Sequence, residues 1–173
     1  TLGTNRAPAP RLSCITTVYN DGQDLLTAVD AMLAQSFGDF ELILVDDGSG
    51  PVTREVLAGL DDPRLRLVTQ GNDGLSSARN VAIRQARGAY LCFLDADDTR
   101  PDWALQAMIE QIDREDPDLM LCPGALSGHR GGVQPFYDQA VFDRLAGLLP
   151  AGHATRDHSA DTEIRALAQL IEP

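Results

Sequence analysis

The sequence predicts an α/β domain in which a mostly parallel sheet has helices on both faces. Two observations lead to this class. Short apolar runs alternate with segments whose apolar residues recur at helical spacing, and polar residues cluster directly after three of the apolar runs. Parallel strands need crossovers that return along a face of the sheet, and helices usually supply them. A length of 173 residues suits one substantial core and is short for two.

The expected elements follow one another in regular order. Residues 1–10 carry Pro and small polar residues without periodicity, so we expect a disordered lead-in there. Strands are expected at 12–18, 40–45, 65–68, 89–94 and 119–122. Helices are expected from Leu25 to Leu33, from Pro51 with Ser49 as its cap, from Leu75 to Arg87 with Gly88 ending it, and from Pro101 onward.

The regular pattern weakens after the fifth expected strand. Residues 124–132 are rich in Gly, which predicts a loop, and two amphipathic segments follow at 141–149 and 164–171. We therefore expect a folded core over 11–125 and a loop with a helical tail over 126–173.

Composition argues against several classes of function. The net charge of −12 disfavours binding to nucleic acid or anionic lipid, because both need clustered basic residues. All 14 basic residues are Arg, which excludes a Walker A lysine and a Schiff-base lysine. The three cysteines lie in expected strands without C-x-x-C spacing, so we expect buried thiols. No apolar stretch approaches the length of a membrane span, so we expect a cytoplasmic chain, with peripheral contact at the inner face of the membrane left open.

The most informative local pattern is a pair of acids, Asp95 and Asp97, directly after an apolar run. In an open parallel sheet, ligands bind beyond the carboxyl ends of the strands. Mg²⁺ or Mn²⁺ held there by one or two carboxylates commonly bridges to substrate phosphates. The pattern therefore indicates nucleotide chemistry, although acids after a strand also serve as plain turn formers.

Further polar clusters fall at the same predicted edge of the sheet. They are Tyr19-Asn20 after the first strand and Asp46-Asp47 after the second. A fourth segment, Gly71 to Asn80, begins a helix and carries Arg79 in its first turns, where backbone amides and a guanidinium favour a phosphate. The alternative for Arg79 is a surface salt bridge with Asp73.

Taken together, these segments resemble the inverting family 2 glycosyltransferases. The matching strings are Thr17-Val18-Tyr19-Asn20, Gln35-Ser36-Phe37, Phe40 to Ser49, Asn72 to Asn80, and Leu94-Asp95-Ala96-Asp97-Asp98. Their order and spacing agree with the family over roughly residues 11 to 125. The resemblance implies a GT-A fold, a Rossmann-like and mostly parallel sheet that forms the nucleotide-sugar-binding half of these enzymes.

The resemblance also implies roles for individual residues. Thr17, Val18 and Tyr19 would line the nucleobase pocket, beside Asn20, and Asp47 would accept a hydrogen bond from the base. Arg79 would lie near the sugar or diphosphate, Asp95 and Ala96 near the ribose, and Asp97, with Asp95, at a Mn²⁺ or Mg²⁺ ion. Asn72 and Gly74 would also belong to the nucleotide-sugar site. Such a cation stabilises the charge that builds on the leaving diphosphate.

The sequence departs from the family pattern at its far end. Family members place a catalytic Asp or Glu in an acceptor-binding half. That half usually begins further downstream than this sequence extends. We therefore expect a truncated domain whose residues 126–173 begin an incomplete acceptor-binding region. Asp161 and Glu163 are the only late acids that suggest a base, and both fit equally well as N-terminal acids of the last expected helix.

Three functions follow as hypotheses. The first is metal-dependent, inverting transfer of a sugar from a nucleoside diphosphate, UDP on family grounds, to a glycan, lipid-linked or protein acceptor, as in polysaccharide biosynthesis. The second is a donor-binding or scaffolding module without a base. The third is a haloacid-dehalogenase-like phosphatase, in which Asp95 would be the nucleophile and Asp97 the acid/base, although that signature normally follows the first strand.

Overall fold

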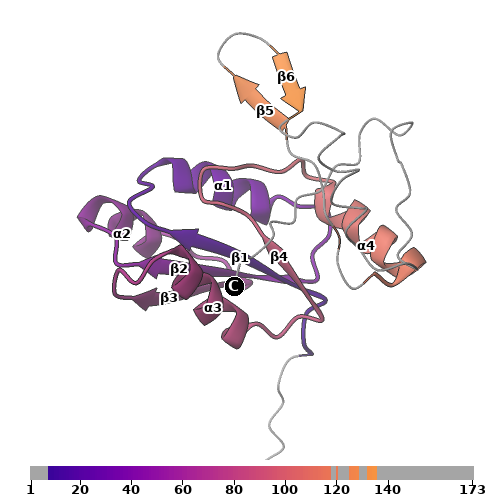
Figure 1. Cartoon of the computed structure of the whole chain (residues 1–173), viewed down its shortest axis with the longest axis horizontal. Helices are drawn as coiled ribbons and strands as arrows, with labels where there is room; N and C mark the ends of the chain where they lie inside the picture. Colours follow the sequence, from indigo (N-terminus) through magenta and orange to yellow (C-terminus); the bar gives the residue numbers. More distant parts are fainter. Residues whose placement is uncertain (1–7, 118–119, 121–124, 129–131, 136–173) are drawn as a thin grey trace, which may run out of the picture.

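The computed structural model describes residues 8–117, residue 120, and the backbone of residues 125–128 and 132–135. Its main sheet has four parallel strands in the order β3-β2-β1-β4. They are β1 (Leu12–Val18), β2 (Phe40–Asp47), β3 (Leu65–Gln70) and β4 (Tyr90–Phe93). Figure 1 shows the sheet with helices above and below it. The predicted α/β class, with a parallel sheet covered on both faces, is confirmed.

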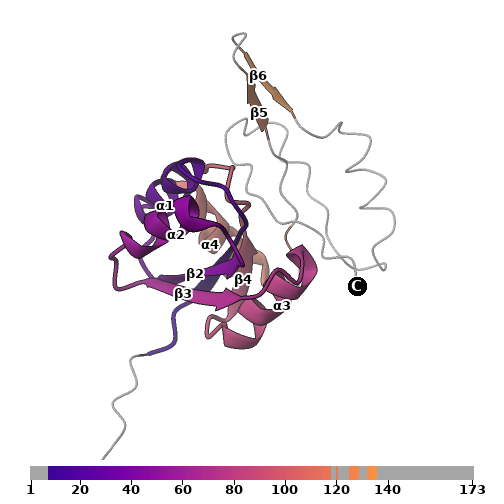
Figure 2. The ribbon, with the colours of Figure 1, turned by 90° about the vertical axis from the view of Figure 1, so that its left-hand side faces the viewer.

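The four helices divide unequally between the two faces of the sheet. Three pack on one face, namely α1 (Asp24–Leu33), α2 (Pro51–Ala58) and α4 (Ala104–Glu115), while α3 (Leu75–Gln85) covers the other. Figure 2 shows this division from the side, with α3 below the sheet. Each helix connects one parallel strand to the next or follows the last one, as crossovers require.

Side-chain alternation along the strands supplies a core on each face. Leu12, Cys14 and Val18 of β1 pack toward α1, α2 and α4, whereas Ile15 points toward the small residues Ala78 and Ala82 of α3. Every residue of β2 is buried, because the strand lies between β1 and β3 and has helices on both faces.

Two strands run further than their apolar residues indicated. β2 continues to Asp47 and β3 to Gln70, and these two residues are partners in the ladder. Polar side chains at strand ends do not stop backbone pairing, so the hydrophobic pattern underestimated both strands. β4 is shorter than expected and begins at Tyr90 rather than at residue 89.

Three helix boundaries also differ from expectation. α2 is preceded by Gly50, and no side chain caps it, so Ser49 is not its cap. α3 ends at Gln85, because Ala86 already has extended backbone. α4 begins at Ala104 rather than at Pro101, because the carbonyl of Pro101 accepts a hydrogen bond from Gln35 Nε2 at 2.7 Å. The side-chain oxygen of the same Gln35 accepts the backbone N–H of Leu105 at 2.9 Å.

Beyond α4 the description is partial. The segment expected to be a loop contains an antiparallel pair, β5 (Ala125–Gly128) with β6 (Gly132–Pro135). Of the strand expected at 119–122, the structure describes only Met120, which is not in a strand. Both amphipathic segments of the tail lie outside the described residues. None of the described helices is long and apolar enough to cross a membrane.

Candidate functional site

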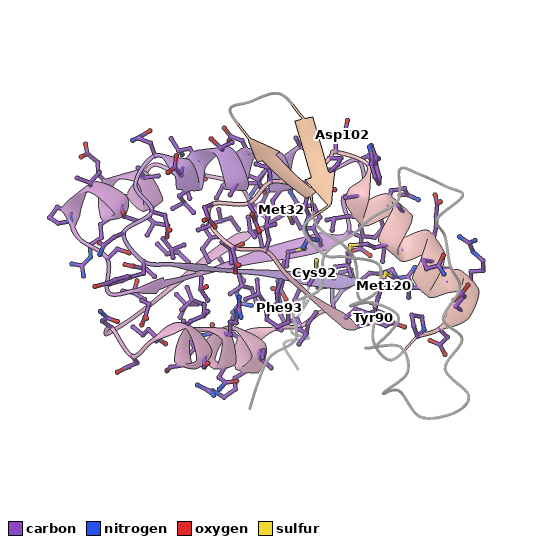
Figure 3. The ribbon with its side chains drawn as sticks, turned by 45° about the horizontal axis from the view of Figure 1, so that its top comes forward. Met32, Tyr90, Cys92, Phe93, Asp102 and Met120 are labelled. Atoms are coloured by element: carbon purple, nitrogen blue, oxygen red, sulfur yellow. The ribbon has the colours of Figure 1, made fainter. Side chains whose placement is uncertain are left out.

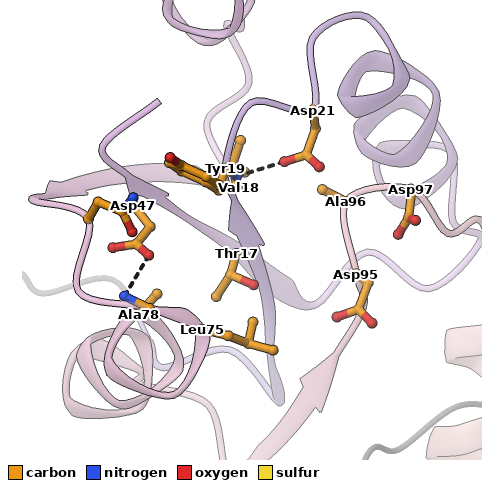
Figure 4. Close-up of a pocket in the computed structure, with 12 residues that line it drawn as sticks. Thr17, Val18, Tyr19, Asp21, Asp47, Leu75, Ala78, Asp95, Ala96 and Asp97 are labelled. Carbon is orange, nitrogen blue, oxygen red and sulfur yellow. Dashed lines mark hydrogen bonds between the residues drawn. The ribbon is translucent and has the colours of Figure 1, made fainter. Parts of the chain in front are cut away.

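A pocket of about 330 Å³ opens at the carboxyl ends of β1, β2 and β4, beside the first turn of α3. It is lined by Thr17, Val18, Tyr19, Asp21, Asp47, Asn72, Gly74, Leu75, Ala78, Asp95, Ala96 and Asp97. Figure 4 shows Asp47 on the left of the pocket, Asp95 and Asp97 on the right, and Thr17 between them. This is the edge at which open parallel sheets bind ligands.

The structure brings together most of the residues that the sequence predicted for a nucleotide-sugar site. All of them line the pocket except Asn20 and Arg79. Three lining residues were not predicted, namely Asp21, Leu75 and Ala78. Leu75 and Ala78 are three apart in the first turn of α3, so a helical face directed at the site was the signal that could have identified them.

Asn20 has a structural position instead. Its backbone is left-handed, with φ of 63°, and its side-chain oxygen accepts the backbone N–H of Gly50 at 2.7 Å. Its own backbone N–H donates to Ser49 Oγ at 3.1 Å. Asn tolerates this conformation better than most residues. Asn20 therefore joins the end of β1 to the turn after β2.

The two acids at the end of β2 separate because neighbouring strand residues face opposite ways. Asp46 accepts the backbone N–H of Ser49 at 2.8 Å and so closes the turn after the strand. Asp47 faces the pocket. The turn itself needs Gly48, whose φ is 78°, and a Cβ there would lie 2.9 Å from the backbone nitrogen of Asn72.

Asp47 is held by three donors. Its Oδ1 accepts Gln70 Nε2 at 2.7 Å and the backbone N–H of Asp73 at 2.9 Å. Its Oδ2 accepts the backbone N–H of Gly74 at 2.9 Å. Burial alone would raise the pKa of Asp47, but these hydrogen bonds outweigh it and lower that pKa. The pocket therefore contains an ionised carboxylate of fixed orientation.

Arg79 lies behind the pocket rather than in its lining. It is buried, and its Nη2 donates to Asp95 Oδ1 at 2.8 Å. Its guanidinium carbon also lies 5.9 Å from the centroid of the Phe93 ring. Within the described residues, no ion pair joins Arg79 to Asp73, the alternative partner suggested by sequence proximity. Arg79 is thus a positioning cation for the first acid of the D-x-D pattern.

The second acid of that pattern, Asp97, differs from Asp95 in its exposure and in its partners. Asp97 is exposed, and no hydrogen bond or ion pair joins it to any residue in the part of the chain that the structure describes. Asp21 lines the same side of the pocket as Asp97 in Figure 4, and it accepts the backbone N–H of Tyr19 at 2.7 Å. Burial, together with the charge of Asp97, raises the pKa of Asp21. Asp21 and Asp97 therefore bring two acids together at this end of the pocket.

The loop that carries these acids is fixed from beneath by Arg100. Arg100 is buried and donates to Cys92 Sγ and to the carbonyl oxygen of Phe93. Figure 3 shows Cys92 and Phe93 as neighbours on β4. Cys14 lies opposite Cys92 in the strand ladder, and both thiols are buried and free, as expected. Hydrogen bonding from Cys14 and the charge of Arg100 lower the pKa of Cys92.

The sequence suggested a divalent cation at Asp95 and Asp97. These residues fit such an ion only if the substrate supplies some of its ligands. Among the described residues, no group of three or more His, Cys, Asp and Glu side chains could hold a metal ion. Mg²⁺ is commonly held by one or two carboxylates with substrate phosphates completing its shell, and Asp97 with Asp95 matches that pattern. The weak candidates for a base, Asp161 and Glu163, lie outside the described residues.

Comparison with known proteins agrees with the resemblance seen in the sequence. The family model "Glycosyl transferase family 2" matches residues 13–149. The succinoglycan biosynthesis protein ExoO of Rhizobium meliloti is 39% identical over 145 residues, which are 82% of this chain and 41% of ExoO. The uncharacterized glycosyltransferase EpsJ of Bacillus subtilis is 36% identical over 115 residues, which are 65% of this chain and 33% of EpsJ.

The same likeness appears among solved structures. TarS 1-349 of S. aureus, in complex with UDP-GlcNAc, superposes with a TM-score of 0.65 at 26% identity, covering 72% of this chain and 37% of that one. The chain thus spans between a third and about two-fifths of the length of these relatives. The sheet order, the pocket at its strand ends and the family match agree, and they show that the chain belongs to glycosyl transferase family 2 with the GT-A fold.

Proposed function

We propose that the pocket binds a nucleoside diphosphate sugar, with a UDP-sugar favoured, as the donor of a metal-dependent, inverting glycosyltransferase. One observation carries this proposal. A fixed, ionised Asp47 stands at one end of the pocket, and Asp97, which no described residue pairs, stands at the other. A nucleobase with N–H donors suits the first end, and a cation that bridges to a diphosphate suits the second.

At the base end, Tyr19 would pack on the ring. Half of Tyr19 is exposed, although it lies beside buried Val18. A large aromatic side chain left open at a pocket wall favours stacking with a planar ligand. Thr17 lines the pocket between the two ends. UDP is favoured because the TarS structure described above contains UDP-GlcNAc.

At the diphosphate end, Asp97 would ligate Mn²⁺ or Mg²⁺, with Asp95 oriented toward the ion or the ribose by Arg79. Such a cation, when bound, stabilises negative charge on the departing diphosphate. The N-terminus of α3, which begins at Leu75, adds backbone N–H groups at the same pocket. These residues would therefore bind and orient the donor so that its anomeric carbon faces the acceptor.

Inversion follows from direct displacement, which needs a base to take the proton of the acceptor hydroxyl. Asp161 and Glu163 remain our proposals for that base. A glycan, lipid-linked or protein acceptor is compatible with the pocket, and the relation to a succinoglycan biosynthesis protein favours polysaccharide biosynthesis. We propose a cytoplasmic location, where nucleotide sugars are supplied.

A donor-binding module without a base is the second candidate. The donor pocket described above would serve this function equally well, because binding a nucleotide sugar needs no base. The two functions differ in sugar release: an enzyme hydrolyses or transfers the donor sugar faster than the metal alone, whereas a binding module does not. The phosphatase hypothesis gains no support, since its nucleophile Asp95 is ion-paired with Arg79 and the chain belongs to another family.

The test is thermal stabilisation by UDP, GDP, dTDP and CDP, each with and without Mn²⁺. A ligand that binds only the native state raises stability in proportion to ln(1 + [L]/Kd). We expect a metal-dependent shift with UDP that disappears in Asp97→Ala. The matched control is Asp61→Ala, because Asp61 is an exposed acid outside the pocket. No shift with any nucleotide, or an equal shift in Asp97→Ala, would contradict the proposal.

A further inference from the structure

Gln70 is the last residue of β3 and does not belong to the pocket lining. It is the ladder partner of Asp47, and its Nε2 donates to Asp47 Oδ1 at 2.7 Å. No role was assigned to Gln70 on the basis of the sequence. Its amide nevertheless fixes one oxygen of the carboxylate that faces the pocket.

The three donors leave Asp47 with little acceptor capacity. An ionised carboxylate has about four lone-pair sites, two on each oxygen. Gln70 and the backbone N–H of Asp73 both bind Oδ1, and the backbone N–H of Gly74 binds Oδ2. Oδ1 is therefore saturated, and a single site on Oδ2 remains for a ligand.

That single site discriminates between nucleobases. Uracil and thymine present one imide N–H between two carbonyl groups, so one acceptor satisfies them. Guanine presents its N1–H beside an amino group, and this pair of donors needs both oxygens of a carboxylate. If guanine bound to Asp47, one of its two donors could use the site on Oδ2, but the other would face Oδ1, which has no acceptor site left. That second donor would lose its hydrogen bond to water without gaining another. Cytosine presents a ring acceptor where uracil has its N–H, which a carboxylate repels.

We propose that Gln70 is a positioning residue for nucleobase selectivity: by occupying Oδ1 of Asp47, it leaves one acceptor that selects an imide base, uracil or thymine, over guanine. The inference rests on the proposed function, since it needs a nucleotide in this pocket. The two backbone donors are fixed by the turn into α3, where Gly74 has φ of 88°. Gln70 is thus the only one of the three donors that a side-chain substitution removes.

The experiment measures the dissociation constants of UDP, dTDP and GDP by calorimetry, in Mn²⁺, for the whole chain and for Gln70→Met. Methionine keeps the length of the side chain and lacks the donor. We expect the unsubstituted chain to prefer UDP and dTDP over GDP by about tenfold or more, the factor that one charge-assisted hydrogen bond supplies. Gln70→Met should reduce that ratio by about tenfold, because Oδ1 regains an acceptor site.

The matched control is Gln106→Met, since Gln106 lies on α4 away from the pocket and donates to Glu110. It should leave the ratio unchanged. A second arm needs no variant: UDP methylated at N3 lacks the imide donor and should bind the unsubstituted chain at least about tenfold more weakly than UDP.

The outcomes separate the two proposals. Binding of no nucleotide at all would overturn the proposed function and this inference with it. Nucleotide binding with the same UDP-to-GDP ratio in Gln70→Met, or equal binding of the N3-methylated ligand, would overturn the inference and leave the donor pocket standing.

Discussion

The acids at the two ends of the sheet differ in the partners that the fold gives them. At the amino end of the strands, Glu41 is 2% exposed and is surrounded by donors from Ser13, Arg66 and Arg87. At the carboxyl end, Asp47 is held by neutral donors only, and no described residue pairs with Asp97. Both groups of acids belong to a chain whose net charge is −12.

This difference fits the proposed division between acids that serve the fold and acids that would bind a ligand. Glu41 receives Ser13 Oγ at 2.7 Å, Arg66 Nη1 at 3.0 Å, and both the backbone and the side chain of Arg87. Its charge is fully compensated within the molecule. At the pocket, Asp47 keeps one unused acceptor site and Asp97 is exposed to solvent, so a ligand could supply a partner to each of them.

The largest expected effect is at Glu41. Glu41→Ala should lower the free energy of unfolding by about 3 kcal/mol, because it leaves two arginines without their shared carboxylate. Urea denaturation measures this change. The matched variant is Asp61→Ala at an exposed acid, which should change the value by less than about 0.5 kcal/mol. A Glu41→Ala protein as stable as the unsubstituted chain would break the proposed division between the two ends.

A smaller effect should appear on acidification. Burial alone would raise the pKa of Glu41, but hydrogen bonds from Ser13, Arg87 and Arg66 lower it from 4.5 to about 2. A lowered pKa in the folded state stabilises the protein above the unfolded value, and this stability is lost as pH falls from about 4.5 to about 2. We expect a loss of about 2 kcal/mol, reduced by solvent screening of the partly exposed arginines.

The measurement is urea denaturation between pH 2 and pH 5, with Glu41→Gln as the control. The control lacks the titrating carboxyl group, so its stability should fall less steeply over this window. Parallel curves for the two proteins would show that Glu41 does not carry the acid sensitivity.

The smallest expected effect is at the pocket. Asp97→Asn and Asp21→Asn should each change the free energy of unfolding by less than about 0.5 kcal/mol, since neither removes an ion pair. Removing either charge relieves the repulsion between the two, so the change can be stabilising. Urea denaturation of both single variants and the double variant measures this coupling. A loss above about 1 kcal/mol in Asp97→Asn would assign this acid to the fold and weaken its assignment to a ligand.

The sequence predicted the central sheet well because apolar runs specify buried strands. It was less accurate where polar side chains hold the backbone. Gln35 reaches Pro101 and Leu105, and these contacts delay the start of α4 in a way that no local pattern reveals. The polar ends of β2 and β3 extended both strands for a similar reason, since ladder pairing continues through Asp47 and Gln70.

The sequence was more informative about which residues line the pocket than about the contacts that they make. Motif strings placed Tyr19, Asp47 and Asp97 at one rim, and the pocket contains all three. The partner of Arg79 was not predictable, because Asp95 is 16 residues away and becomes its neighbour only through the fold. Asp73 is close to Arg79 in sequence, but the ion pair that the structure shows for Arg79 is with Asp95. The donors to Asp47 come from residues 23 to 27 positions away, so these contacts likewise arise only through the fold.

The buried guanidinium of Arg100 has a consequence for the state of the chain before any ligand arrives. Three carboxylates fall within Asp95 to Asp98, and their mutual repulsion gives the loop a high electrostatic self-energy. Arg100, 5% exposed, is a permanent counter-charge beneath them, and it opposes the rise in the pKa of Asp98 that burial and its acidic neighbours cause. Arg100 therefore offsets part of this repulsion, and we expect the loop to keep its folded shape before a cation binds.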